Sequence, residues 1–293
     1  MMQRVMVKVY GGLGNQLFCY ACGYAVAKYN NCDLVIDTSQ QDNDSFRKVD
    51  ILNFKIIFSK RITFKKGTNL LYRAIINHLF LLSRIGLRTT IIKERECYKY
   101  DSEIFHIGKK NVYLKGYWQN HQYFEKYRED LLHMFFPAIE VSDYGKKMQN
   151  KINSCEKSVA IHIRRGDYLS IGCSIGQDYY DLAIKYMEKA LVNNITYVIF
   201  SDDILFAEEF RNKNKKLDML VINNLSDHAT VEDLFLMSKC RHQIIANSSY
   251  SWWAAWLNTN HNKVVICPEV KSWEDDFYPE NWIRIQAEVC KYS

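Results

Sequence analysis

The chain has little proline and glycine: 3 prolines and 12 glycines occur among its 293 residues. Disordered tails and flexible linkers are usually rich in these residues, so the composition argues against both. With 48% hydrophobic and 25% charged residues, the chain can instead bury a core. Its length suits one large domain or two of ordinary size.

A strong excess of one charge is also missing. The 39 basic and 33 acidic residues leave a net charge of +6, which is too small and too evenly spread to indicate a nucleic-acid partner. A small polyanionic ligand such as a nucleotide would suit this balance equally well.

Cysteine is present, but in no pattern typical of a disulfide scaffold. The nine cysteines are odd in number and lie mostly in apolar segments, which predicts a reduced, cytoplasmic protein. Cys19 and Cys22 form a C-x-x-C pair within a helical pattern, with no second pair elsewhere. We therefore expect a structural role for them rather than a metal or redox site.

No apolar run is long enough to cross a bilayer. Residues 69–88 look apolar, yet their uncharged part, residues 74–83, is only half the roughly 20 residues that a spanning helix needs. The amino terminus leads directly into a predicted strand, with no signal peptide. We expect residues 69–88 to form a core helix, with a peripheral contact to an anionic membrane surface as the alternative.

The second half alternates between apolar strands and amphipathic helices. This alternation predicts a parallel sheet with helices on both faces. The predicted strands are residues 159–163, 196–203, 219–222, 243–246 and 263–267, and the predicted helices are residues 179–191, 204–210, 231–239 and 251–257.

The first half begins with the same β-α-β order, with strands at residues 5–9 and 33–37, but the regularity then fades. A polar stretch rich in Lys and Asn, residues 139–157, is the predicted domain boundary. The predicted fold class is therefore α/β, with two Rossmann-type domains, residues 1–150 and 151–293, facing a cleft. Open parallel sheets bind ligands beyond the carboxyl ends of their strands, so motifs at those ends are the candidate sites.

The first of these motifs is GGLGNQ. Gly12, Gly14 and the later Asp37 nearly satisfy the dinucleotide fingerprint, in which G-x-G-x-x-G follows a strand and an acidic residue comes about 20 positions later. Leu17 occupies the place of the third glycine. An NAD-dependent Rossmann oxidoreductase is therefore an alternative rather than the favoured interpretation.

The sequence HIRRGDY ends the predicted strand at residues 159–163. Arg164 and Arg165 are costly there unless they meet anions, and the planar fork of donors on arginine suits phosphate. Asp167 could hold one guanidinium and leave the other to a ligand. Because side chains alternate along a strand, Arg165 should point away from Arg164, toward Asp167 or another structural carboxylate. A surface cluster of ion pairs is the other interpretation.

Two further strand ends carry polar residues. Asp202 could accept hydrogen bonds from a guanine edge or a ribose, whereas Asp203 is expected to cap the following helix. Asn247, Ser248 and Ser249 open a later helix, and a helix start with free N–H groups and hydroxyls attracts anions.

Five motifs in this order make the sequence similar to a known family: GGLGNQLF, GYWQNHQYF, HIRRGDY, FSDD and NSSYSWWAAWL. Together, over residues 8–268, they resemble the α-1,2-fucosyltransferases of glycosyltransferase family 11. The resemblance implies a GT-B-like fold, GDP-fucose as donor, the 2-hydroxyl of a galactose-terminated glycan as acceptor, inversion of the fucose anomeric carbon and no metal or other cofactor. It further implies that the second domain binds GDP-fucose and the first lies on the acceptor side.

The same resemblance implies roles for single residues. Arg164 would grip the β-phosphate, supported by Arg165 and Asp167, and these three are the predicted catalytic residues. His162 would lie near the nucleoside and Asp202 near guanosine. The other predicted donor-binding residues are Asn247, Ser248 and Ser249 near the diphosphate, and Gly12, Asn15 and Gln16 in a loop of the first domain. Cys19 departs from the family, which commonly has Gln there.

The chemistry of the transfer explains these roles. Cleavage of the fucose–phosphate bond places negative charge on the leaving diphosphate, where a fixed guanidinium acts most strongly. No D-x-D motif appears at a predicted strand–loop edge, where a metal–diphosphate clamp would lie, and the S-D-D at residues 201–203 lacks the spacer. The acceptor hydroxyl must lose a proton to a carboxylate or an imidazole. The candidates for this general base are Glu94, Glu96, His121 and Asp178, with none preferred.

Three other functions remain open from the sequence. A fucosyltransferase of another linkage would use the same arginine motif. A non-catalytic glycan-binding or scaffold protein would need no phosphate grip, and the NAD-dependent oxidoreductase leaves HIRRGDY and NSSYSWW unexplained. For the transferase we expect a bacterial, cytoplasmic location, with peripheral contact to the inner membrane face left open.

Overall fold

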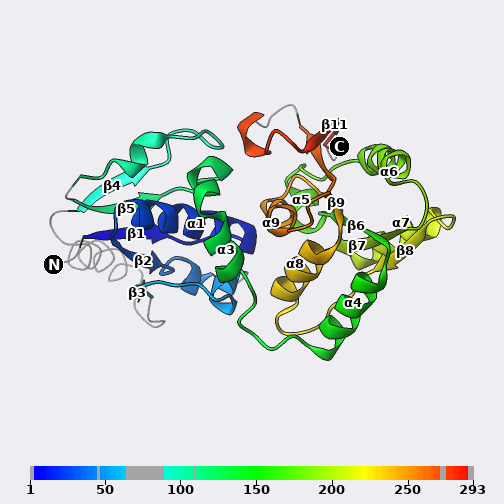
Figure 1. Ribbon diagram of the computed structural model, residues 1–293, viewed down its shortest axis with the longest axis horizontal. Helices are drawn as coiled ribbons and strands as arrows, with labels where there is room; N and C mark the ends of the chain where they lie inside the picture. The colour runs from blue at the N-terminus through cyan, green and yellow to red at the C-terminus, as the bar shows by residue number, and fades with distance from the viewer. Residues whose placement is uncertain (1–2, 45–46, 64–88, 109, 271–274, 290–293) are drawn as a thin grey trace. The chain divides into compact units, whose positions relative to one another are not determined.

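The computed structural model describes residues 3–44, 47–63, 89–108, 110–270 and 275–289. The chain divides into two compact units, Met1–Phe136 and Pro137–Ser293, drawn in Figure 1 in blue to green and in green to red. Residues 69–88, the predicted core or membrane-surface helix, lie outside the described residues. No helix in the described part of the chain is long and apolar enough to span a membrane.

Unit 1 contains a five-stranded sheet in the order β3-β2-β1-β5-β4, and all of its neighbouring strands are parallel. The helix α1 (Leu13–Tyr29) follows β1 and is buried along most of its length. The strands are β1 (Arg4–Lys8), β2 (Asp33–Asp37), β3 (Lys60–Ile62), β4 (Thr89–Lys93) and β5 (Asn111–Lys115).

Helix α1 packs closely on β1 at one glycine. A Cβ atom on Gly23 would lie 2.6 Å from a methyl group of Val7, so no larger residue fits there. Leu17, which stands at the third glycine position of the dinucleotide fingerprint, is fully buried instead. The glycine that allows close helix–strand packing is therefore Gly23, six residues after the position that the fingerprint uses.

The other described elements of unit 1 are short. The helix α3 (Arg128–Met134) ends it. The 3-10 helices are η1 (Gln41–Asn43), η2 (Asp50–Asn53), η3 (Ser102–Phe105), η4 (His121–Tyr123) and η5 (Glu125–Tyr127). Their lengths of three or four residues explain why no periodicity is visible in this part of the sequence.

Unit 2 contains a six-stranded parallel sheet in the order β11-β10-β9-β6-β7-β8. Taken in chain order, this is the 3-2-1-4-5-6 arrangement of Rossmann folds, with β6 as the first strand. The strands are β6 (Lys157–Ile163), β7 (Ile195–Ser201), β8 (Asp218–Val221), β9 (His242–Ile244), β10 (Val265–Glu269) and β11 (Ile283–Gln286).

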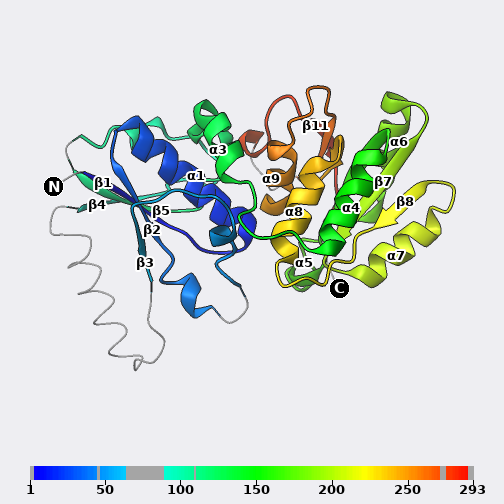
Figure 2. The same ribbon diagram turned by 60° about the horizontal axis from the view of Figure 1, so that its bottom comes forward.

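Helices cover both faces of this sheet, with α4, α8 and α9 on one side and α6 and α7 on the other (Figure 2). The core between the sheet and the second pair contains Ile161, Ile199, Met187 and Phe210. The helices are α4 (Asp143–Ser154), α5 (Gly166–Ser170), α6 (Gln177–Leu191), α7 (Ile204–Lys213), α8 (Ala229–Lys239), α9 (Ser249–Leu257) and the 3-10 helix η6 (Asp275–Phe277).

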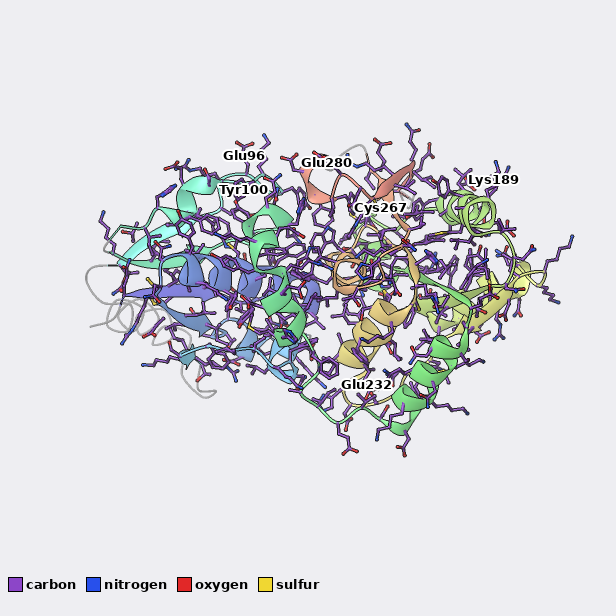
Figure 3. All side chains as sticks on the ribbon, in the orientation of Figure 1. Glu96, Tyr100, Lys189, Glu232, Cys267 and Glu280 are labelled. Carbon is purple, nitrogen blue, oxygen red and sulfur yellow. The ribbon has the colours of Figure 1, made fainter. Side chains whose placement is uncertain are left out.

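The boundary between the units lies earlier than the sequence predicted. The stretch at residues 139–157 is not a linker, since it forms α4 and the start of β6, and residue 150 lies inside α4. Ser142 caps α4 and donates from its backbone N–H and its hydroxyl to Glu232 of α8, both at 2.7 Å. Glu232, labelled in Figure 3, is 1% exposed. This buried carboxylate therefore ties α4 to unit 2.

Candidate functional site

The polar motifs of unit 2 follow two neighbouring strands, β6 and β9. In a sheet of this order the connections run in opposite directions from these two strands, and ligands bind at their carboxyl ends. His162 is the second-to-last residue of β6, Arg164 and Arg165 follow the strand, and Ser248 and Ser249 follow β9. The sequence motifs therefore meet at the expected edge of one sheet.

Arg164 is held by two carboxylates. Its Nη2 lies 2.6 Å from Asp167 Oδ1 and its Nη1 lies 2.8 Å from Asp202 Oδ2. The guanidinium carbon is 5.3 Å from the centre of the Tyr168 ring. The Arg164 side chain remains 31% exposed, and its buried Nε has no hydrogen-bond partner in the described part of the chain. The two carboxylates thus fix the plane of a guanidinium that still has unused donors.

Arg165 points to the α7 side of the sheet. Its Nε donates to Asp203 Oδ2 at 3.0 Å, and its guanidinium carbon lies 3.9 Å from the centre of the Phe206 ring. The expected alternation of Arg164 and Arg165 is therefore present. The expectation that one arginine stays unpaired is wrong, because β7 ends beside β6 and supplies both Asp202 and Asp203.

Asp202 joins the two arginines. One oxygen accepts from the backbone N–H of Arg165 at 2.8 Å and the other contacts Arg164. Both oxygens are thus engaged within the chain, so a guanosine contact, as the sequence suggested, would have to share them. Asp203 caps α7 by accepting from the N–H of Phe206 at 3.0 Å, as expected. This hydrogen bond, with that from Arg165, lowers the pKa of Asp203.

His162 is 4% exposed and lies 5.5 Å from the Tyr250 ring of α9, between ring centres. Burial, reinforced by the positive charge of Arg164, lowers the pKa of His162 to about 3. Its Nδ1 has no hydrogen-bond partner among the described residues. His162 is therefore a neutral imidazole that can form a hydrogen bond with a ligand but adds no charge.

The start of α9 provides small polar groups. Ser248 caps the helix by accepting from the N–H of Tyr250 at 3.3 Å, and Ser249 is its first residue. Asn247 is 1% exposed and donates to the carbonyl of Cys173 at 2.9 Å, while its own Oδ1 accepts no hydrogen bond from any residue that the structure describes. This arrangement leaves an acceptor and a half-buried hydroxyl beside the helix start.

Unit 1 has a comparable site at the carboxyl ends of β1 and β5, where GGLGNQ and GYWQN meet. The rings of Tyr10 and Tyr117 stack with centres 4.5 Å apart. Asn15 Oδ1 accepts from Gln119 at 2.9 Å. The two motifs, which are far apart in the sequence, therefore form one structural cluster.

Gln16 has a structural role, and its predicted contact with the donor is wrong. It is fully buried, its amide nitrogen donates to the carbonyls of Gly11 and Lys48, and its oxygen accepts from the N–H of Ile51. Gly11 needs its glycine because its φ is +84°. Gly12 is the N-cap residue of α1, and a Cβ atom there would meet nothing within 4 Å, so its backbone remains open to a ligand.

Glu94 has a role that the sequence did not indicate. Its carboxylate accepts from the N–H groups of Tyr117 at 2.8 Å and Trp118 at 2.9 Å, and burial raises its pKa. A Cβ atom on Gly116 would lie 2.4 Å from Glu94. As a general base Glu94 is therefore disfavoured, because it holds the loop that presents Tyr117.

The other candidate bases are less constrained. Glu96 is exposed and paired with Lys99, and Asp178 lies in the first turn of α6. His121 Nδ1 lies 3.6 Å from Glu125 and has no hydrogen-bond partner within the described ranges of unit 1. None of these contacts selects one residue as the base.

Asp37, the acidic residue of the possible dinucleotide fingerprint, is buried. Its oxygens accept from the hydroxyl of Tyr113 at 2.7 Å and from the N–H of Ser39 at 2.9 Å. These contacts argue against a ribose-binding role and hence against the oxidoreductase. Cys19 and Cys22 are fully buried, and burial raises the pKa of both thiols. No group of three potential metal ligands occurs among the described His, Cys, Asp and Glu residues.

Comparisons with known proteins agree with this arrangement. The family model of glycosyl transferase family 11 matches residues 4–286. An alpha-1,2-colitosyltransferase of Escherichia coli is 32% identical over 97% of this chain and 100% of its own length. The O-antigen biosynthesis glycosyltransferase WbnK of Escherichia coli is 31% identical over 88% of this chain and 91% of its own.

Among solved structures, the fucosyltransferase NodZ from Bradyrhizobium has a similar fold. Its TM-score is 0.53 at 10% identity, over 87% of this chain and 93% of that one. Together with the two parallel sheets, this likeness confirms the predicted fold class, α/β and GT-B-like with two Rossmann-type domains.

Proposed function

The chain belongs to glycosyltransferase family 11, and on this premise we propose that it transfers L-fucose from GDP-fucose to the 2-hydroxyl of a galactose-terminated glycan. The transfer would invert the anomeric carbon and need no divalent cation. An alpha-1,2-colitosyltransferase that is 32% identical over its whole length supports the linkage.

The observation that carries this proposal is the position of Arg164. It follows β6 at the point where Rossmann sheets bind phosphates, and Asp167 and Asp202 hold its guanidinium. Arginine has five N–H donors, and these contacts use two. The remaining donors would bind the β-phosphate of the donor as charge builds up on it.

Fixed donors of this kind act mainly on the transition state. They need no reorganisation when the sugar–phosphate bond breaks, and one such group is typically worth ~10²–10³ in rate. The N–H groups and hydroxyls at the start of α9 would bind the rest of the diphosphate. Neutral His162 would bind the nucleoside by hydrogen bonding, without competing with Arg164 for the anion.

A second candidate donor is GDP-colitose, which the named activity of the 32% identical relative favours. Colitose is L-fucose without its 3-hydroxyl group, so both donors would present the same diphosphate to Arg164. A site that forms a hydrogen bond with the 3-hydroxyl of fucose would discriminate strongly against colitose, because the protein group that makes this bond would be left unpaired.

The two donors can be compared directly. The protein is incubated with GDP-fucose or GDP-colitose, a panel of galactose-terminated acceptors and excess EDTA, and the product linkage is determined by NMR. We expect an α-1,2-linked product in EDTA with at least one donor, and a much slower reaction for Arg164→Ala.

Three results would count against the proposal. A β-linked product would contradict inversion. Activity that is lost in EDTA and restored by Mn²⁺ would contradict metal independence. Failure of both donors on every acceptor would reject the proposed activity itself.

A further inference from the structure

Three lysines lie side by side across the sheet of unit 1. Lys8, Lys115 and Lys93 each end one strand, β1, β5 and β4, which are adjacent in the sheet (Figure 1). Lys115 pairs in register with Lys93, and Lys8 follows the pair formed by Val7 and Leu114. Aligned residues of parallel strands point to the same face, so the three ammonium groups form a row.

The row is only partly neutralised within the described part of the chain, where Asp37 is the carboxylate in register with Lys8. None of the three lysines forms a salt bridge with a described residue. Asp37, which pairs with Lys8 on β2, accepts instead from Tyr113 and Ser39. Burial lowers the pKa of Lys8 and the charge of Lys115 lowers it further, while the carboxylate of Asp37 acts in the opposite direction.

Such a row is unfavourable without a ligand. Like charges directly opposite each other in a sheet destabilise it, and among the described residues only the carboxylate of Asp37, in register with Lys8, offsets part of that cost. An anion placed over the row would remove the repulsion and gain three charged contacts.

The dimensions favour one compact anion. Neighbouring strands are about 4.8 Å apart, so the row covers about 10 Å, which suits a phosphate or diphosphate better than a broad lipid surface. Lys8 is half-buried, with its Nζ 4.6 Å from the centre of the Tyr10 ring, whereas Lys93 and Lys115 are exposed. A recessed lysine beside two exposed ones favours a ligand that fits among them.

We propose that Lys8, Lys115 and Lys93 bind a phosphate or diphosphate group carried by the acceptor glycan. This inference rests on the proposed function, in which the donor diphosphate is bound by Arg164 in unit 2. A transferase has one other substrate, so an anion site in unit 1 belongs to the acceptor. Tyr10 and Tyr117, two residues beyond Lys8 and Lys115, would offer the adjoining sugar an aromatic surface.

Two matched acceptors test the proposal. Both are the same galactose-terminated oligosaccharide, one with a neutral methyl group at its reducing end and one with a diphosphate ester. With wild-type protein at low salt, we expect KM for the charged acceptor to be about tenfold lower, as two or three partly exposed charge contacts would give. The difference should shrink as ionic strength rises.

Substitution of the row should remove this preference. In the triple variant Lys8→Gln, Lys93→Gln, Lys115→Gln, KM should rise about tenfold more for the charged acceptor than for the neutral one. Lys60→Gln, an exposed lysine on β3 of the same sheet, is the matched control and should keep the preference. Equal KM values for both acceptors in the wild type, or a preference that survives in the triple variant, would overturn the proposal.

A binding experiment separates this site from the reaction. Inorganic diphosphate is titrated by calorimetry into protein saturated with GDP, and binding is expected in the wild type and Lys60→Gln but not in the triple variant. Diphosphate binding can be measured even if no acceptor is fucosylated. A lack of fucosylation would reject the proposed function but not the anion site. Absence of binding in the wild type would reject the anion site.

Two further measurements identify the source of the phosphate. A fall in GDP affinity in the triple variant would assign the lysines to the donor and overturn the acceptor assignment. Sedimentation with phosphatidylglycerol vesicles that is lost in the triple variant, without any preference between the acceptors, would assign them to lipid headgroups. We expect unchanged GDP affinity and no lysine-dependent sedimentation.

Discussion

Gly166 and Asp202 lie so close together that a Cβ atom on Gly166 would stand 2.5 Å from Asp202 Oδ2. That oxygen contacts Arg164, and the other oxygen of Asp202 accepts from the backbone N–H of Arg165. The glycine of HIRRGDY therefore allows a carboxylate from the neighbouring strand to reach both arginines.

Gly166→Ala should move Asp202 and loosen Arg164. A displacement of about 1 Å at a catalytic group can cost ~10²-fold in rate, so we expect kcat to fall at least tenfold. Ser170→Ala, at the far end of the same short helix, is the control and should keep its activity. Steady-state kinetics and melting curves of both variants provide the measurement. A Gly166→Ala protein with wild-type kcat would show that Asp202 does not position Arg164.

Arg164→Lys should mainly lower kcat, whereas Arg165→Lys should mainly lower thermal stability. Lysine keeps the charge of Arg164 but loses the fork of donors, so kcat should fall by ~10²-fold or more while donor affinity changes less. Arg165→Lys loses the contact with Asp203 and the stacking on Phe206, and should lower Tm by about 2–4 °C. Kinetics and a thermal melt of each variant separate the two roles. Near wild-type kcat in folded Arg164→Lys would contradict the role given to Arg164.

Ser249→Ala should weaken GDP binding more than Ser251→Ala. Ser249 is the first residue of α9 and is half-buried, whereas the hydroxyl of Ser251 is fully buried and turns back to the carbonyls of Ala246 and Ser248. Calorimetric titration with GDP measures both. Equal affinities would mean that the helix start is a cap and nothing more.

The depressed pKa of His162 should make the protein sensitive to acid. The unfolded chain takes up this proton near the ordinary value of about 6.5, whereas the folded chain resists it down to about 3. The unfolded state therefore binds more protons between these values, and the free energy of unfolding should fall by about 1.4 kcal/mol for each pH unit of acidification.

His162→Gln should flatten this dependence, because it removes the titrating group. Denaturant unfolding at pH 7.5, 6.5, 5.5 and 4.5 measures the slope for each protein. His261→Gln, at an exposed position, is the control and should keep the wild-type slope. Parallel curves for wild type and His162→Gln would show that burial does not depress the pKa of this histidine.

Most of unit 2 could be predicted because its elements are long and regular. All the predicted strands and helices of this half are present, with ends displaced by a few residues. The strand β11 was missed because its four residues, although they alternate between apolar and polar, are too short a run to stand out. In unit 1, β3 and β4 were missed because these short edge strands have few buried residues and carry little hydrophobic signal. The strand β5 was missed as well, although its three middle residues are buried.

The boundary between the two units also could not be predicted from local sequence. The residues at 139–157 are polar because α4 is a surface helix with only a few buried positions, not because they form a linker. Its attachment to unit 2 depends on Glu232, which is ninety residues away in the chain. No local pattern reports a contact of that kind.

The sequence by itself determined the order of strands and helices in unit 2, the motifs at the ends of β6 and β9, and the alternation that separates Arg164 from Arg165. These properties depend on residue type and local spacing. Only the tertiary structure decided which groups the side chains contact. Asp202 holds Arg164, the amide of Gln16 forms hydrogen bonds with backbone groups, and three lysines form a row. Strand order and register set those contacts, since they bring together residues far apart in the chain, and local spacing carries no information on them.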